Sequence, residues 1–256
     1  MSDFEVHQFV AFHDNYIYLV RYDDAGNCFA VDPADPDKTL EELKSKGWTL
    51  THIFITHHHP DHTGGNEALV AETGAEVIGS VKEADKTPKI GTEVSEGSEI
   101  VLDGHIARVF DVPGHTAGHV AYWFKEERAL FPGDTLFSLG CGRLFEGSAA
   151  QMWESLQKLR RLHDDTKIYC AHEYTSSNAD FALTVESDNA DLKKRADEVV
   201  ALREQGKPTI PAILGDERRI NPFLRADIPE LQAAVGMTGK LPAEVFAEVR
   251  RRKDAS

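Results

Sequence analysis

The first two thirds of the chain alternate short apolar segments with turn-forming residues. The segments NYIYLV (15–20) and CFAVDP (28–33) flank the polar stretch DDAGN (23–27), and this pattern predicts two strands joined as a hairpin. Six further apolar segments have the length and composition of buried strands. They cover residues 52–56, 75–79, 105–112, 119–124, 128–133 and 167–171.

Helices are predicted between some of these strands and throughout the last third of the chain. Residues 35–47 form a predicted helix in which Asp35 can cap the first turn and Gly47 can end the last one. The segments 66–74 and 149–165 are also predicted helices, and only helical segments are evident after Glu173. This order predicts an α+β or layered domain over residues 1–173, followed by an all-helical domain over residues 174–256.

Charge is distributed unevenly between these two parts. The 256 residues include 28 Lys and Arg against 43 Asp and Glu, a net charge of −15. Residues 1–173 carry −14 of this and residues 174–256 only −1, so the helical part is where an anion could be held. Because nucleic acid requires a cationic surface, the acidic balance argues against nucleic acid as a partner.

Two features bear on location. The N-terminus MSDFEVHQFVAFHD lacks the basic and apolar regions of a secretion signal, and no apolar run approaches the ~20 residues of a membrane span. Cys28, Cys141 and Cys170 are odd in number and scattered, which is typical of proteins in a reducing compartment. We therefore expect a cytoplasmic protein that does not bind membranes. We also expect a monomer.

The segment THHHPDHTGG (56–65) is the densest group of possible metal ligands. It follows a predicted strand, and alternate residues of an extended chain face the same way. His57 and His59 can therefore reach one ion while His58 points away. Three more donors follow other predicted strands, at the edge of a sheet where sites form in layered α/β proteins. They are His115, Asp134 and His172.

These donors divide into two metal sites. One consistent partition places His57, His59 and His115 on one ion, and Asp61, His62 and His172 on the other, with Asp134 bridging through its two oxygens. A set of nitrogen and oxygen donors suits zinc, iron or manganese without selecting among them. His58 and His119 can support the ligands from outside the coordination sphere. We interpret the remaining histidines as ordinary core or surface residues: His7, His13, His52, His105 and His163.

Several segments resemble a known family. THHHPDHTGGN, PGHTAGH, PGDTLF and AHEYT are similar to the metallo-β-lactamase superfamily and, within it, to the glyoxalase II or hydroxyacylglutathione hydrolase family. The resemblance extends over nearly the whole chain through GCGRLFEG (140–147), AHEYTSSNADFA (171–182), NPFLR (221–225) and RRRKD (250–254). It implies an αββα sandwich with a C-terminal helical domain, and the same seven metal ligands.

The resemblance also implies a substrate. In this family S-(2-hydroxyacyl)glutathione, typically S-D-lactoylglutathione, is hydrolysed to the hydroxy acid (D-lactate) and glutathione, in the second step of methylglyoxal detoxification. The implied glutathione contacts are Arg143, Phe145, Tyr174, Arg250 and Lys253. Many eukaryotic members have lysine and tyrosine in place of Arg143 and Phe145, whereas bacterial-type members share Arg-Leu-Phe. The missing hydroxyl of Phe145 removes one hydrogen bond to glutathione.

The predicted chemistry is attack of a metal-bound hydroxide on the thioester carbonyl. A bound ion lowers the pKa of water to about 7. Two ions, for which we expect zinc, can share the resulting hydroxide and stabilise the oxyanion. Asp61 can orient the hydroxide beside the ions that Asp134 bridges. A leaving thiolate with a pKa of about 8.5 needs no strong general acid. We interpret Cys141, which lies between glycines, as part of a tight loop and not as a nucleophile.

Other functions account for only part of this pattern. A β-lactamase would usually carry a secretion signal, and an RNA-processing nuclease would show a basic surface or an added domain. A non-catalytic metal-binding module would not need the complete ligand set. A persulfide dioxygenase, which uses one iron in a related fold, is the closest alternative to the hydrolase.

Overall fold

The computed structural model describes residues 4–256. The chain forms two compact units that are interleaved in sequence. The first unit contains the described residues up to Asp111 together with Gly118–Gly133, and the second contains Val112–Ala117 and Asp134–Ser256.

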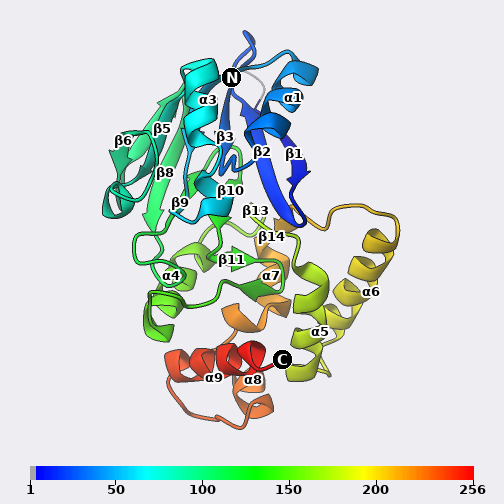
Figure 1. Ribbon diagram of the computed structural model, residues 1–256. Helices are drawn as coiled ribbons and strands as arrows, with labels where there is room; N and C mark the ends of the chain where they lie inside the picture. Colours follow the sequence, from blue (N-terminus) through cyan, green and yellow to red (C-terminus); the bar gives the residue numbers. More distant parts are fainter. Residues whose placement is uncertain (1–3) are drawn as a thin grey trace. The chain divides into compact units, whose positions relative to one another are not determined.

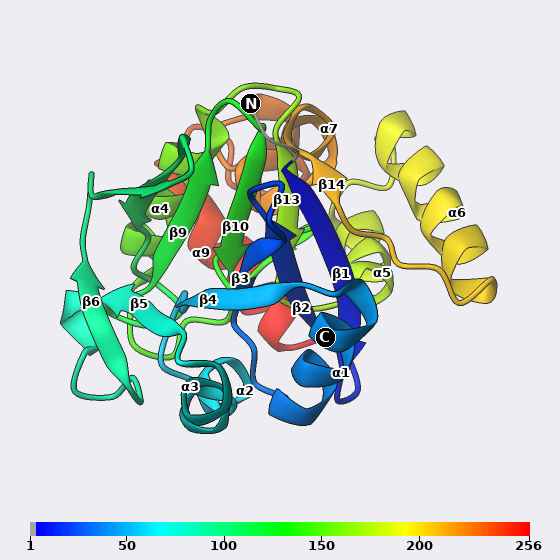
Figure 2. The ribbon, with the colours of Figure 1, turned by 90° about the horizontal axis from the view of Figure 1, so that it is seen from above.

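The first unit contains a mixed sheet of six strands in sequential order. Its first three strands pair antiparallel, with the hairpin between residues 15 and 33 as predicted, and the remaining pairs are parallel. Figure 2 shows β1, β2 and β3 beside one another in this sheet. The strands are β1 (Glu5–Ala11), β2 (Asn15–Arg21), β3 (Asn27–Val31), β4 (Thr49–Phe54), β5 (Glu76–Ser80) and β6 (Ile90–Val94).

Four antiparallel strands of the same unit form a second sheet surface, in the order β10-β9-β8-β7. Aromatic side chains fill the space between the two sheets: Phe29 of β3 stacks on Phe124 of β9 at 5.3 Å, and Phe54 of β4 lies 4.8 Å from Tyr122 of β9. The strands are β7 (Glu99–Leu102), β8 (His105–Asp111), β9 (Val120–Phe124) and β10 (Ala129–Gly133).

Helices cover the opposite face of the six-stranded sheet. Ile17, Ile53 and Val77 of the sheet pack with Leu43 and Leu69 in one buried cluster. Leu43 belongs to α1 (Pro36–Lys46) and Leu69 to α3 (Asn66–Thr73), which Figure 1 shows on this side of the strands. The first unit is therefore a three-layer arrangement of helices, mixed sheet and antiparallel sheet. The short elements α2 (Pro60–Thr63) and η1 (Val81–Glu83) complete it.

The second unit is mainly helical. Two short antiparallel pairs, β11 with β12 and β13 with β14, accompany its helices, and α5 packs beside α6 (Figure 1). The α4 helix packs against α9, where Trp153 lies 6.2 Å from Phe246. The elements are β11 (Leu136–Phe137), β12 (Gly140–Cys141), α4 (Ala149–Arg160), β13 (Lys167–Cys170), α5 (Thr175–Val185), α6 (Ala190–Glu204), β14 (Ala212–Ile213), α7 (Leu214–Ile220), η2 (Pro222–Leu224), α8 (Pro229–Ala234) and α9 (Pro242–Asp254).

Local signals placed many of these elements correctly. The α1 helix has the predicted caps: the Asp35 carboxylate accepts from the Lys38 backbone N–H at 3.0 Å, and Gly47 adopts a φ of 68°. The predicted helix 149–165 was too long, because α4 ends at Arg160. There the Arg218 guanidinium donates to the Arg160 and Leu162 carbonyls, replacing the bonds of a further helical turn.

Other elements were not predicted. Strands β1, β6 and β7 lack a clear alternation of apolar and polar residues, and β14 is a strand in the region predicted to contain only helices. Ala212 and Ile213 of β14 pair with Ile168 and Lys167 of β13, so this strand depends on a partner distant in sequence. No helix within residues 4–256 combines the length and the apolar character needed to cross a membrane.

Candidate metal and substrate site

The segment THHHPDHTGG connects β4 to α3 and contains the short helix α2. Two glycines are needed because the chain passes close to other backbone: a Cβ on Gly65 would lie 2.0 Å from the Pro33 carbonyl oxygen, and one on Gly64 would lie 2.7 Å from the Pro60 oxygen. The first three histidines of the segment have different hydrogen-bonding partners. His57 Nε2 lies 3.0 Å from His59 Nδ1, whereas the His58 backbone N–H donates to the Glu83 carboxylate at 2.8 Å.

Glu83 is a buried residue that the sequence analysis did not identify. The Oε1 atom of Glu83 accepts from the Gly118 backbone N–H at 3.0 Å, and its Oε2 atom lies 3.1 Å from His58 Nδ1. One carboxylate thus contacts both the backbone and the ring of His58, and this ring also meets the His59 ring edge-on with centroids 5.0 Å apart. The other histidine predicted to support the site, His119, is buried and stacks on His57 with ring centroids 4.6 Å apart.

Asp32 is a second residue that the sequence analysis missed. It follows β3, is buried, and has a φ of 49°, a conformation uncommon for a residue with a side chain. One carboxylate oxygen accepts from the Thr56 hydroxyl at 2.6 Å and lies 3.0 Å from His62 Nδ1. Thr56 Oγ1 is in turn 3.1 Å from His57 Nδ1. Asp32 thus orients His62 directly and His57 through Thr56, so that each ring presents Nε2 as the possible ligand atom.

Asp32, His57 and His62 also form one of the groups that could hold a metal ion. The signal for Asp32 was present in the sequence, since an aspartate directly after an apolar strand is the feature that selected Asp134. Asp61 differs from these residues because 47% of its side chain is exposed. The Asn15 amide donates to the Asp61 backbone carbonyl at 3.0 Å, and His62 Nε2 lies 3.6 Å from its carboxylate.

In the second unit, Asp134 lies between two of the predicted ligands. One of its oxygens is 3.4 Å from His115 Nε2, and the other is 3.4 Å from His172 Nε2. All three residues are buried. His115 Nδ1 donates to the Arg143 carbonyl at 2.9 Å, which places the ring's lone pair on Nε2, facing Asp134. One carboxylate thus presents a separate oxygen to each imidazole.

The aromatic residues predicted to bind substrate pack on these same histidines. The ring of Tyr174 stacks on His172 with centroids 4.8 Å apart and planes at 2°, and Phe145 meets His115 edge-on at 5.2 Å. Phe145 is 62% exposed and Tyr174 37% exposed, so each ring retains a surface that a substrate can contact.

The three predicted cationic contacts have different environments. Arg143 is exposed, whereas Arg250 is only 5% exposed. Lys253 donates to the Ser177 carbonyl at 2.8 Å and lies over the Phe181 ring. Burial, followed by the charges of Arg250 and Arg143, lowers the pKa of Lys253. The positive charges of Arg250 and Arg143 therefore both act on the Lys253 ammonium.

Cys141 is buried, and its carbonyl accepts a hydrogen bond from Arg250 at 3.0 Å. Burial raises the pKa of its thiol to about 11, although the nearby Arg250 acts in the opposite direction. A thiol with this pKa remains protonated at neutral pH, and only the thiolate is a strong nucleophile. This agrees with the interpretation that Cys141 is structural.

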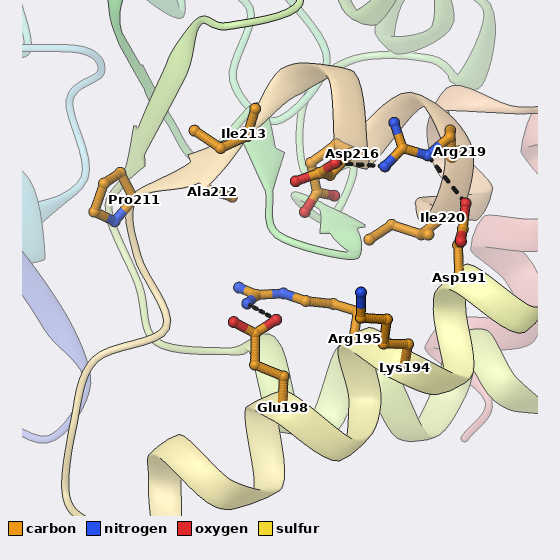
Figure 3. Close-up of a pocket in the computed structure, with 11 residues that line it drawn as sticks. Asp191, Lys194, Arg195, Glu198, Pro211, Ala212, Ile213, Asp216, Arg219 and Ile220 are labelled. Carbon is orange, nitrogen blue, oxygen red and sulfur yellow. Dashed lines mark hydrogen bonds and ion pairs between the residues drawn. The ribbon is translucent and has the colours of Figure 1, made fainter.

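The second unit also contains a pocket of about 290 Å³ between α6, β14 and α7 (Figure 3). Its charged side chains pair mainly with each other, Arg195 with Glu198 at 2.9 Å and Arg219 with Asp191 at 3.0 Å. None of the residues predicted to bind metal or substrate lines this pocket. This pocket therefore shares no lining residue with the candidate site.

Two family descriptions match successive parts of the chain. Residues 11–172 match the metallo-beta-lactamase superfamily, and residues 173–256 match the hydroxyacylglutathione hydrolase C-terminus. A protein named hydroxyacylglutathione hydrolase from Rhodospirillum rubrum is 55% identical over 254 residues, covering 99% of both chains. A protein of the same name from Methylococcus capsulatus is 52% identical over 250 residues, covering 98% of both.

Solved structures show the same fold at lower identity. The BLEG-1 B3 metallo-beta-lactamase matches 86% of this chain and 99% of its own, with a TM-score of 0.67 and 22% identity. The predicted metallo-β-lactamase fold with a C-terminal helical region is thus confirmed. Because the similarity to the curated relatives extends over the full length, including the C-terminal helices, the chain belongs to the hydroxyacylglutathione hydrolase family of the metallo-β-lactamase superfamily.

Proposed function

We propose that this chain hydrolyses the thioester of S-(2-hydroxyacyl)glutathione, S-D-lactoylglutathione being the expected substrate, to the 2-hydroxy acid and glutathione. The observation that supports this function is the similarity over the full length, at 55% and 52% identity, to two proteins named hydroxyacylglutathione hydrolase. Residues 173–256 also match the description of the hydroxyacylglutathione hydrolase C-terminus. The hydrolase predicted from the sequence is confirmed at the level of the family, and the persulfide dioxygenase alternative is not favoured.

The donor atoms present fit a divalent metal ion. The first unit offers imidazole and carboxylate groups around His57, and the second places Asp134 between two imidazoles. Such nitrogen and oxygen donors suit zinc, with iron and manganese as alternatives. The proposed ligands are seven residues for two ions, with Asp134 bridging: His57, His59, Asp61, His62, His115, Asp134 and His172.

Divalent ions held by these residues would lower the pKa of bound water to about 7 and polarise the thioester carbonyl. Asp61 is suited to accept a hydrogen bond from the attacking water, since its carboxylate is partly exposed and the Asn15 amide fixes its backbone. The glutathione thiolate leaves without a strong general acid, because its pKa is about 8.5. Cys141 takes no part in this chemistry.

The proposed glutathione contacts are Arg143, Phe145, Tyr174, Arg250 and Lys253. Glutathione carries two carboxylates and one ammonium, so cations near its peptide end offset the acidic charge of the chain. Tyr174 and Phe145 present ring surfaces beside His172 and His115, which would place the thioester next to the metal ligands. Phe145 would contribute apolar contact only.

A direct assay tests the function. The purified protein is mixed with S-D-lactoylglutathione, and the release of glutathione thiol is followed before and after treatment with a chelator. Thiol release that disappears on chelation and returns with zinc is the expected result. Oxygen consumption with glutathione persulfide, without thioester hydrolysis, would instead identify the dioxygenase.

His58→Ala is expected to keep the metal content of the native protein, because His58 Nδ1 lies against the Glu83 carboxylate whereas His59 Nδ1 lies against His57 Nε2. His59→Ala is the matched comparison and should lose bound metal. Metal analysis of both purified variants measures this difference. Loss of an ion from His58→Ala would show that the alternation of the three histidines does not define the ligands.

Lys253→Ala is expected to raise KM for S-lactoylglutathione about tenfold or more and to leave metal content unchanged. A charge-assisted hydrogen bond to a carboxylate contributes roughly 1.5–3 kcal/mol, of which each 1.4 kcal/mol is a factor of ten. Steady-state kinetics with a small neutral thioester provide the control, since its KM should not change. An equal rise in KM for both substrates would exclude recognition of glutathione by this charge.

Three further predictions remain proposals. The division into a catalytic domain (1–173) and a helical glutathione-binding domain (174–256) is supported by the change from strands to helices. Location in the cytoplasm is supported by the cysteine pattern of the sequence. We also propose a monomer, which gel filtration with light scattering would test.

A further inference from the structure

The short hairpin formed by β11 and β12 follows Asp134 and is held by side chains from several helices. Asn178 of α5 donates to the Ser138 carbonyl at 3.1 Å, and Asn221, which follows α7, donates to the Phe137 and Gly140 carbonyls at 3.1 Å each. Glu217 of α7 accepts from the Ser138 hydroxyl and the Leu139 backbone N–H, both at 2.8 Å. The hairpin backbone is therefore positioned by the C-terminal helical region.

Arg250 of α9 makes the last of these contacts. Its Nη1 donates to the Cys141 carbonyl at 3.0 Å, and Nη2 pairs with Asp254 at 2.8 Å. The guanidinium also lies over the Phe223 ring, 5.1 Å from its centroid. A side chain that is 5% exposed and held from three directions has little freedom to move.

The Cys141 carbonyl is two residues from the backbone group that orients His115. The Arg143 carbonyl accepts the hydrogen bond from His115 Nδ1 at 2.9 Å. Gly142, between them, packs so closely that a Cβ would lie 2.0 Å from the Asp134 carbonyl oxygen and 3.0 Å from His115 Nδ1. Gly142 thus lies against both the Asp134 backbone and His115, and Arg143 is hydrogen-bonded to His115.

We infer that Arg250 is a positioning residue for the proposed metal ligand His115, acting through the backbone of residues 141–143. By holding the Cys141 carbonyl, it fixes the Arg143 carbonyl that sets the tautomer and orientation of the His115 ring toward Asp134. This inference rests on the proposed function, because it assigns Arg250 a role in binding metal in addition to the proposed contact with glutathione.

Arg250→Met tests the role, because methionine keeps an unbranched apolar stem and removes every donor. The apparent zinc affinity of the apoprotein is measured by competition with a chromophoric chelator, and folding is monitored by circular dichroism and thermal melting. We expect zinc binding roughly 10- to 100-fold weaker than in the native protein, the usual effect of losing a group that orients a ligand. Arg250→Lys, which restores one donor, should recover part of the affinity.

Arg251→Met is the matched control, since Arg251 is on the same helix but is exposed and paired with Glu248. Its zinc affinity should stay within twofold of native. Native affinity in Arg250→Met, even with a lower melting temperature or a higher KM, would overturn the inference and leave Arg250 with a structural or substrate role alone. If Arg250→Met does not fold, Arg250→Lys decides: a loss of threefold or more supports the inference, and a smaller loss overturns it. Failure of the native protein itself to bind zinc, iron or manganese would instead contradict the proposed function.

Discussion

Asp134→Ala is expected to lower kcat for S-D-lactoylglutathione by roughly a thousandfold and to release much of the bound metal. Asp134 presents one oxygen to His115 and the other to His172, each at 3.4 Å, and alanine removes both. Polarisation by metal contributes several kcal/mol to a hydrolysis, and each 1.4 kcal/mol of barrier is a factor of ten in rate. Metal analysis and steady-state kinetics on the same preparation measure the two effects together.

A matched variant separates this effect from the general loss of an acidic residue. Asp197 lies on the exposed face of α6, so Asp197→Ala should keep both native metal content and native kcat. The bridging role of Asp134 is wrong if Asp134→Ala retains two tightly held ions and a near-native kcat.

Glu217→Ala is expected to destabilise the protein by about 3–5 kcal/mol, the largest effect on folding that we predict. Its buried carboxylate accepts hydrogen bonds from Ser138, Leu139 and Asn221. Alanine would leave the Ser138 hydroxyl and the Leu139 N–H without this acceptor, and each buried unsatisfied group costs about 1–3 kcal/mol in addition to the cavity. Chemical denaturation gives the free energy of unfolding, and Glu204→Ala, at an exposed position on α6, should change it by less than about 0.5 kcal/mol.

Glu217→Gln tests how the free energy of unfolding depends on pH through this carboxyl group. Burial raises the pKa of Glu217 above its usual 4.5, so the folded protein holds this proton to a higher pH than the unfolded chain. The stability that this proton contributes is fully present below pH 4.5 and is lost as pH rises through the raised pKa. Glutamine does not titrate. The difference in unfolding free energy between native and Glu217→Gln should therefore shrink as pH rises through that range, and a constant difference would contradict the role of burial.

The sequence alone located most of the candidate site. The donors of THHHPDHTGG stand within one segment. Asp134 comes directly after the apolar strand β10, and His172 is two residues after the end of β13. Such positions can be predicted because strand periodicity and capping residues are local properties of the chain. The same locality explains why the bounds of α1 were predicted closely, with Asp35 and Gly47 at its two ends.

Only the tertiary structure showed which groups support these donors. Asp32 reaches His62 across 30 positions in the sequence, and Arg250 reaches the Cys141 carbonyl across 109. The sequence RRRKD shows four cationic residues but not which of them are buried. In the structure, the orientation of α9 about its axis buries Arg250 and leaves Arg251 exposed. Successive helical residues point about 100° apart, so their burial depends on what packs against each face. Which residues can orient a ligand therefore depends on that packing, and the pattern of residues along the chain does not predict it.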